Sequence, residues 1–188
     1  MENSTFTVKR ELVEVIKLIR IILLMKNIKA IQVVLWASVI LWMFIIFLLS
    51  GQNAKESSNL STGITEKIIE IIVPSFNDMS VLEKADIMDS IHHIVRKTAH
   101  AAAYFMLGIL CISVMQTNLI KPFKKIILSL GICLVYAISD ETHQAFIPGR
   151  GPSPYDVGID FCGSLIGILV FLLILTIYKN IKKKVAES

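Results

Sequence analysis

The chain has 188 residues, of which 54% are hydrophobic and only 18% are charged, below the roughly 25% charged that is usual in soluble domains. Its net charge of +4 does not indicate nucleic-acid binding, because the basic residues flank apolar blocks and form no face interleaved with aromatic residues. The three cysteines each lie inside an apolar block, and their odd number argues against a disulfide framework. These features exclude an ordinary soluble domain.

Residues 1–30 are expected to form an amphipathic helix on the cytoplasmic surface of a membrane. Apolar residues recur there at helical spacing, while charged residues mark another side of the helix. The basic residues suit an anionic lipid surface and are Lys9, Arg10, Lys17, Arg20, Lys26 and Lys29. The alternative, a first transmembrane segment, is disfavoured by charges throughout the stretch.

The apolar blocks that follow predict four membrane-spanning helices in one domain over residues 31–178. A helix rises ~1.5 Å per residue, so about 20 apolar residues cross a hydrocarbon core roughly 30 Å thick. Blocks of this kind cover residues 31–50, about 98–115, a stretch from 126 onward, and about 159–178. Four spans and their loops leave no length for a separate soluble domain. We therefore expect an all-α, polytopic membrane helical bundle.

Basic residues are distributed unevenly around these spans. They crowd the N-terminal segment, the 116–125 loop and a tail at 179–188, which share one side of the membrane when there are four spans. By the positive-inside rule, both termini are then cytoplasmic, and the loops at 51–97 and 145–158 face outward. The tail is expected to be a basic cytoplasmic extension.

The outer loop at 51–97 is expected to be partly helical. An apolar stripe of isoleucines between residues 64 and 72 stops at Pro74. Ser80 and Glu83 have the spacing of a capping box, in which each side chain satisfies a backbone donor of the other residue. A helix beginning at this cap would lead directly into the second span.

The third span is too short to cross the membrane on apolar residues alone. Its uncharged run at 126–139 covers only about 20 Å as a helix, against a core of roughly 30 Å. The helix must therefore include the residues that follow, which are Asp140, Glu141, Thr142, His143 and Gln144. Ionisable groups inside a membrane are costly unless they face protein, water, a cation or a ligand, so they indicate a functional site.

Helical spacing groups further polar residues with these. Asp140 shares a face with His143 and Gln144, whereas Glu141 points elsewhere. In the second span the residues on one face are Lys97, His100 and Tyr104, with Arg96 close to His100. Asp156 and Asp160 lie one turn apart at the start of the fourth span, and Gly163 and Gly167 continue that side as a GxxxG pair that lets another helix approach closely. We expect all of these groups at one depth near the outer surface.

The types of these residues predict two kinds of chemistry. Asp140, Glu141, His143 and His100 are candidates for acid–base catalysis or for binding a cation together with Asp160. Arg150 is the best candidate for holding a phosphate or carboxylate, because a guanidinium can bind either bidentately. Arg96 and Lys97 would assist it. The loop at 148–154 that carries Arg150 contains three prolines, which limit its freedom.

Structural roles compete with each of these interpretations. Asp140 and His143 could tie helices together by pairing with Arg96, Lys97 or Arg150. Asp156 fits a capping box with Ser153, with Pro154 at the first helical position. His92 and His93 with Asp89 have helical spacing for a metal, but a solvated helix surface explains them better. The chain lacks HExxH and CxxC, so a metal site has no motif support.

At these residues the chain resembles the VanZ-like family over about residues 31–178. The matching segments are residues 47–52 with Ser57 and Ser58, residues 96–100 with Tyr104 and Leu107, residues 139–150, and Asp156, Gly163 and Gly167. The resemblance adds Ser50 and Gln52 to the expected ligand-binding residues. It implies a bacterial cytoplasmic-membrane protein connected with reduced susceptibility to lipoglycopeptides such as teicoplanin.

The chain departs from the family pattern at two positions. Family members commonly have an acidic residue where this chain has Ala103, and an asparagine where it has Asp160. An exchange of a carboxylate between helices is one explanation of the two departures, and no role is carried over for either position.

We expect an outward-facing polar site that binds an anionic envelope lipid or peptidoglycan precursor, with or without modifying it. Its ligand-binding residues would be Arg150, Arg96, Lys97, Gln144, Tyr104, Asp156, Gln52 and Ser50. The alternative is a non-enzymatic membrane protein that alters drug access or binds an envelope partner, with the charged residues as helix ties. The sequence leaves open the reaction, the metal or cofactor, and the oligomeric state.

Overall fold

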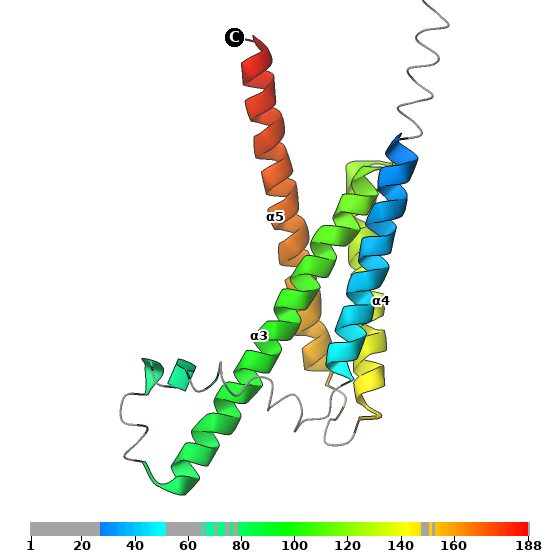
Figure 1. Cartoon of the computed structure of the whole chain (residues 1–188). Helices are drawn as coiled ribbons and strands as arrows, with labels where there is room; N and C mark the ends of the chain where they lie inside the picture. Colours follow the sequence, from blue (N-terminus) through cyan, green and yellow to red (C-terminus); the bar gives the residue numbers. More distant parts are fainter. Residues whose placement is uncertain are drawn as a thin grey trace, which may run out of the picture.

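The protein is a bundle of long helices (Figure 1). The structure, a computed structural model, describes residues 27–51, 65, 67–69, 71–73, 76, 79–147, 151 and 153–187. Within this part of the chain there is no β-strand, and four helices are long and apolar enough to cross a membrane. They are Asn27–Ser50, α3 (Val81–Gln116), α4 (Pro122–Gln144) and α5 (Pro154–Glu187). The predicted fold class is thereby confirmed. Residues 1–26, with most of the expected interfacial helix, lie outside the described residues.

The Asn27–Ser50 helix, the N-terminal span, is tied to α3 and α4 by polar contacts along its length. Its first four residues, 27–30, belong to this helix and extend the span predicted to begin at residue 31. Gln32 Nε2 donates to Asn118 Oδ1 at 3.2 Å. Trp42 Nε1 donates to the Ala103 carbonyl at 2.8 Å. The Tyr136 hydroxyl donates to the Met43 carbonyl. Such bonds hold helices together where lipid offers the polar groups no partner.

Helix α3 begins at the predicted capping box. The Ser80 amide donates to Glu83 Oε2 at 3.0 Å, and the Glu83 amide donates to Ser80 Oγ at 3.4 Å. The helix has 36 residues, or roughly 54 Å at ~1.5 Å per residue, which exceeds the hydrocarbon core. Its first turns extend beyond the other helices (Figure 1). There the Thr65 hydroxyl lies 3.0 Å from His92 Nδ1, so part of the outer loop rests on this extension.

Helices α3 and α5 make the most extensive contact between labelled helices, and glycines permit it. The predicted Gly163 and Gly167 pair faces α3, and Gly108 of α3 faces α5 in turn. A Cβ atom would overlap the backbone of the opposite helix at all three positions, at the Ala101 carbonyl for Gly163, at the Phe105 carbonyl for Gly167 and at the Ser164 carbonyl for Gly108. The expectation of a close helix approach is confirmed.

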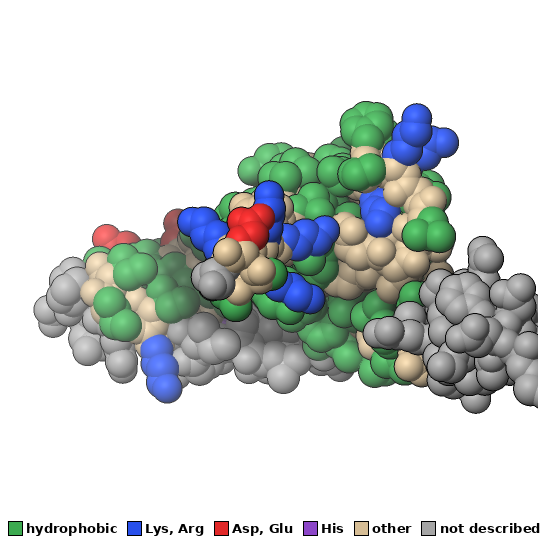
Figure 2. All heavy atoms as spheres, turned by 90° about the horizontal axis from the view of Figure 1, so that it is seen from above, with side chains coloured by type: hydrophobic (Ala, Val, Ile, Leu, Met, Phe, Trp, Pro, Cys, Tyr) green, Lys and Arg blue, Asp and Glu red, His purple; other side chains and the backbone are tan. Residues whose placement is uncertain are grey.

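Basic residues gather at one end of the bundle. Figure 2 views this end and shows basic side chains over it. The lysines near the corresponding helix ends are Lys29, Lys121, Lys124, Lys125, Lys179, Lys182, Lys183 and Lys184. The end of the N-terminal span, the end of α4 and the start of α5 meet at the opposite end (Figure 1). This asymmetry is the pattern from which cytoplasmic termini are predicted.

Candidate functional site

At the end opposite the lysines, α3, α4 and α5 surround a cavity of about 120 Å³. Its lining is mostly polar and consists of Arg96, Lys97, His100, Gln144, Gly151, Asp156, Ile159 and Asp160. The sequence predicted that polar residues of the second, third and fourth spans lie at one depth, and the lining residues do come from all three. Of the other predicted ligand-binding residues, Arg150 and Gln52 lie outside the described part of the chain.

Asp140 of α4 is buried beside this cavity, with 3% of its surface exposed. Ser50 Oγ, at the end of the N-terminal span, donates to its Oδ2 atom at 2.9 Å, and Gln144 Nε2 donates to the same atom at 3.2 Å. The predicted grouping of Asp140 with Gln144 is therefore present. Its other oxygen, Oδ1, is buried without a hydrogen-bond partner. One carboxylate oxygen thus fixes the side chain, and the second remains available.

His100 and Asp160 complete a three-helix cluster around that oxygen. One ligating atom from each of His100, Asp140 and Asp160 lies within 4.8 Å of the others. Asp160 is also 3% exposed, and its Oδ1 atom is likewise buried without a hydrogen-bond partner. Tyr104 is completely buried, within electrostatic range of both aspartates. An imidazole and two carboxylates therefore converge where α3, α4 and α5 meet.

His143 is the predicted site residue that the structure does not bring into this cluster. Its ring stacks on Phe47 of the N-terminal span, with ring centroids 4.3 Å apart and planes at 21°. Residues three apart on a helix differ by roughly 60° in direction at 3.6 residues per turn. Both residues contact the N-terminal span, His143 through Phe47 and Asp140 through Ser50, but only Asp140 also reaches His100 of α3 and Asp160 of α5. The imidazole that shares the cluster with Asp140 is His100, and a catalytic pair of Asp140 and His143 stays a prediction.

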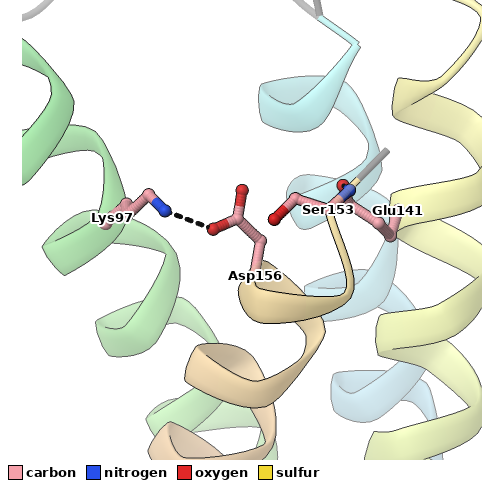
Figure 3. A network of polar contacts seen from close by, with 4 residues as sticks. All are labelled: Lys97, Glu141, Ser153 and Asp156. Atoms are coloured by element: carbon pink, nitrogen blue, oxygen red, sulfur yellow. Dashed lines mark hydrogen bonds and ion pairs between the residues drawn. The ribbon is translucent and has the colours of Figure 1, made fainter. Parts of the chain in front are cut away.

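Asp156 and Glu141 hold the start of α5 (Figure 3). Lys97 Nζ of α3 lies 2.6 Å from Asp156 Oδ1 and 4.7 Å from the centre of the Tyr155 ring. The buried Glu141 of α4 accepts a hydrogen bond from the Ser153 amide. The sequence predicted instead that Asp156 would cap its own helix by accepting from Ser153. Glu141 takes that amide, which leaves the Asp156 carboxylate to pair with Lys97.

The Lys97–Asp156 ion pair should contribute little to stability. The two side chains are 23% and 33% exposed, and partly solvated ion pairs are usually worth about 0.2–1 kcal/mol. A double-mutant cycle of K97M and D156N, followed by thermal unfolding in detergent, should give a coupling within this range. The pair between Lys183 and Glu187, with side chains 75% and 64% exposed, is the matched control and should give less. Equal coupling in both pairs would show that the tie between α3 and α5 lies elsewhere.

Arg96 is the cation of the cavity lining without an ion pair among the described residues. It precedes Lys97 on α3, and Lys97 is neutralised by Asp156. A guanidinium offers a planar fork of donors that matches the oxygens of a phosphate or carboxylate. The cavity therefore presents an available cationic group near its buried acidic cluster.

The two positions that depart from the family pattern have different surroundings. Asp160 belongs to the cluster with His100 and Asp140. Ala103 lies among the partly buried residues that pack against the core, and its carbonyl accepts the Trp42 indole hydrogen bond. The carboxylate at Asp160 is thus an integral part of the site in this chain.

Comparison with known proteins gives one match. A model of the VanZ/LLP1 family matches residues 35–175, which include most of the N-terminal span and all of the residues that line the cavity. No curated protein and no solved structure matches the chain significantly.

Proposed function

Because the chain belongs to the VanZ/LLP1 family and is a multi-pass membrane protein with four spanning helices, we propose that it acts in the bacterial cytoplasmic membrane. There it lowers susceptibility to lipoglycopeptides such as teicoplanin. It does so by binding an anionic envelope lipid or peptidoglycan precursor in the cavity between α3, α4 and α5. The cavity faces outward and both termini are cytoplasmic, an orientation supported by the lysines at the opposite end.

The observation that carries this proposal is the Arg96 guanidinium at the wall of a polar cavity. It has no ion pair among the described residues, while its neighbour Lys97 is paired with Asp156. An anionic head group would supply the missing counter-charge and accept two hydrogen bonds from the guanidinium. Arg150, from the loop after α4, is proposed as a second contact to the same anion.

Proton transfer to or from the bound head group is a further part of the proposal. His100 lines the cavity, and an oxygen of Asp140 lies within 4.8 Å of ligating atoms of His100 and Asp160. An imidazole and a carboxylate can exchange a proton with a ligand that reaches them. Glu141 and His143 take positioning roles here, because one holds the Ser153 amide and the other stacks on Phe47.

Replacing Arg96 with glutamine tests the binding proposal. A hydrogen bond to a charged group is worth about 1.5–3 kcal/mol, so R96Q should weaken head-group binding by roughly 10- to 100-fold and restore teicoplanin susceptibility. R96K keeps the charge without the fork and should be intermediate. K84Q is the matched control, because it removes a positive charge from the same helix outside the cavity.

Membrane abundance of each variant must be measured together with susceptibility. The proposal expects R96Q to be as abundant as the unaltered chain and yet inactive. An abundant R96Q protein with undiminished resistance would exclude the cavity as the head-group site.

A second function has its own support in the helix ties. Asp140 is held by Ser50 and Gln144, and Lys97 is bound to Asp156, so the charged residues also suit a non-enzymatic protein that alters drug access or binds an envelope partner. Under that function, S50A and Q144L should lower the unfolding temperature in detergent and lose activity together. Folded but inactive variants would favour the binding site.

A further inference from the structure

The cluster of His100, Asp140 and Asp160 has the geometry of a metal site. Each residue comes from a different helix, and one ligating atom of each lies within 4.8 Å of the other two. Both aspartates are 3% exposed, and both Oδ1 atoms lack a hydrogen-bond partner. Buried carboxylate oxygens are normally satisfied by donors or by a cation. The Tyr104 hydroxyl is a nearby donor for Asp140 and is itself buried without a hydrogen-bond partner, so it can satisfy at most one of the two oxygens and a further ligand is needed for the other.

The hydrogen bonds around Asp140 resemble those that orient metal ligands. Ser50 and Gln144 both donate to Oδ2, which fixes the carboxylate and leaves Oδ1 for coordination. Outer hydrogen bonds of this kind commonly hold a ligating carboxylate in place. Ser50 of the N-terminal span and Gln144 of α4 therefore hold the Asp140 carboxylate in a fixed orientation.

Charge balance favours a divalent ion. Two buried carboxylates carry two negative charges, and no described lysine or arginine forms an ion pair with either of them, because Lys97 is bound to Asp156 and Arg96 lines the cavity without reaching the aspartates. An uncompensated carboxylate at membrane depth is strongly unfavourable. One divalent cation with a neutral imidazole would neutralise both aspartates.

We propose that His100, Asp140 and Asp160 bind one divalent transition-metal ion. A set of one imidazole nitrogen and two carboxylate oxygens suits Zn²⁺ or Mn²⁺ better than Mg²⁺ or Ca²⁺, which prefer oxygen ligands alone. Ligands of tetrahedral Zn²⁺ lie ~2.0–2.2 Å from the metal and hence about 3.4 Å from one another. The three atoms lie within 4.8 Å of one another, so binding would require them to move closer together.

The position of the site gives the ion an accessible coordination position. His100 and Asp160 line the cavity that Arg96 and Lys97 also line. Three protein ligands leave a place for water or for an oxygen of a bound anion, as in catalytic zinc sites. Metal binding does not rest on head-group binding at Arg96, and it would replace the proposed proton transfer, because His100 and Asp140 cannot exchange a proton through atoms that coordinate an ion.

The test is metal uptake by the full chain purified in detergent. After treatment with a chelator, the protein is titrated with Zn²⁺ and with Co²⁺, and bound metal is measured by mass spectrometry and by Co²⁺ absorption. We expect one ion per chain. Loss of a hydrogen bond to a metal ligand commonly weakens metal binding by about 10- to 100-fold. H100Q and D160N each remove a ligand itself, so each should weaken metal binding by at least about 100-fold.

D86N is the matched control, because Asp86 is an exposed carboxylate of α3 that belongs neither to the cavity lining nor to the cluster. It should bind the ion as the unaltered chain does. Absence of uptake by the unaltered chain would overturn the proposal whether or not any variant folds, and would favour a proton shared between the two aspartates. Equal binding by H100Q, D160N and the unaltered chain would place the ion elsewhere.

The two proposals can fail separately. Metal uptake measured in R96Q should match that of the unaltered chain, because Arg96 is not a ligand. A chain that binds the ion while R96Q keeps full resistance would refute head-group binding alone. A chain that binds no ion while R96Q loses resistance would refute the metal site alone.

Discussion

Replacing Gly167 with valine is expected to prevent the chain from accumulating in a folded form, whereas the same change at Gly131 should have little effect. A Cβ at Gly167 would overlap the Phe105 carbonyl of α3, and backbone cannot move aside as a side-chain tip can. Inserting groups into a packed interior usually costs about 1–3 kcal/mol. Because the colliding group is backbone, we expect the free-energy cost of G167V to lie at or above the upper end of that range.

Gly131 of α4 is exposed and has no atom within 4 Å of the position of a Cβ, so G131V adds the same side chain without a collision. Thermal unfolding in detergent and membrane abundance are the measurements for both variants. A G167V protein as stable as G131V would mean that α3 and α5 do not cross at their glycines.

Replacing Glu141 with leucine is expected to release the start of α5. The Ser153 amide would lose its carboxylate acceptor, and a hydrogen bond to a charged group is worth about 1.5–3 kcal/mol. Hydrogen exchange at the Ser153 amide should therefore become roughly 10- to 100-fold faster. Gly151 lines the cavity two residues before this amide, so resistance should fall as well.

Glutamine at position 141 is the matched control. Its amide oxygen can still accept from Ser153, and E141Q should keep most of the protection from exchange. Unchanged exchange in E141L would show that the connection before α5 is held by other contacts.

The polar end of α4 could be predicted from the sequence by length alone. An apolar run too short for the membrane required the helix to continue through Asp140 and Gln144, and α4 does end at Gln144. The capping box at Ser80 and the small-residue face at Gly163 were equally direct. In each case the inference concerned one helix and its local geometry, for which spacing along the chain is sufficient.

Partners between helices could not be predicted in the same way. Spacing predicts that Asp140 and His143 share a side of α4, and both do contact the N-terminal span, but it could not predict that His100 of α3 is the imidazole in the cluster with Asp140. Periodicity gives the direction of a side chain relative to its own axis. It does not give the rotation of that axis against its neighbours, on which these contacts depend.

The sequence contains a signal for the hydrogen bond from Ser50 to Asp140. Ser50 lies at the end of a long apolar span, in a segment that matches the family pattern. A hydroxyl at that depth needs an acceptor, and Asp140 was the carboxylate predicted at the same depth. The roles of Arg150 and Gln52 stay predictions.

The contacts of α4 have a consequence for biogenesis. Helices leave the ribosome one after another, so when α4 enters the bilayer Ser50 is already present, but Ser153 and Asp160 have not yet been synthesised. A product truncated before α5 would therefore lack the Ser153 amide that donates to Glu141 and the Asp160 carboxylate of the cluster with Asp140. The polar end of α4 acquires its full set of partners only when the last helix has been made.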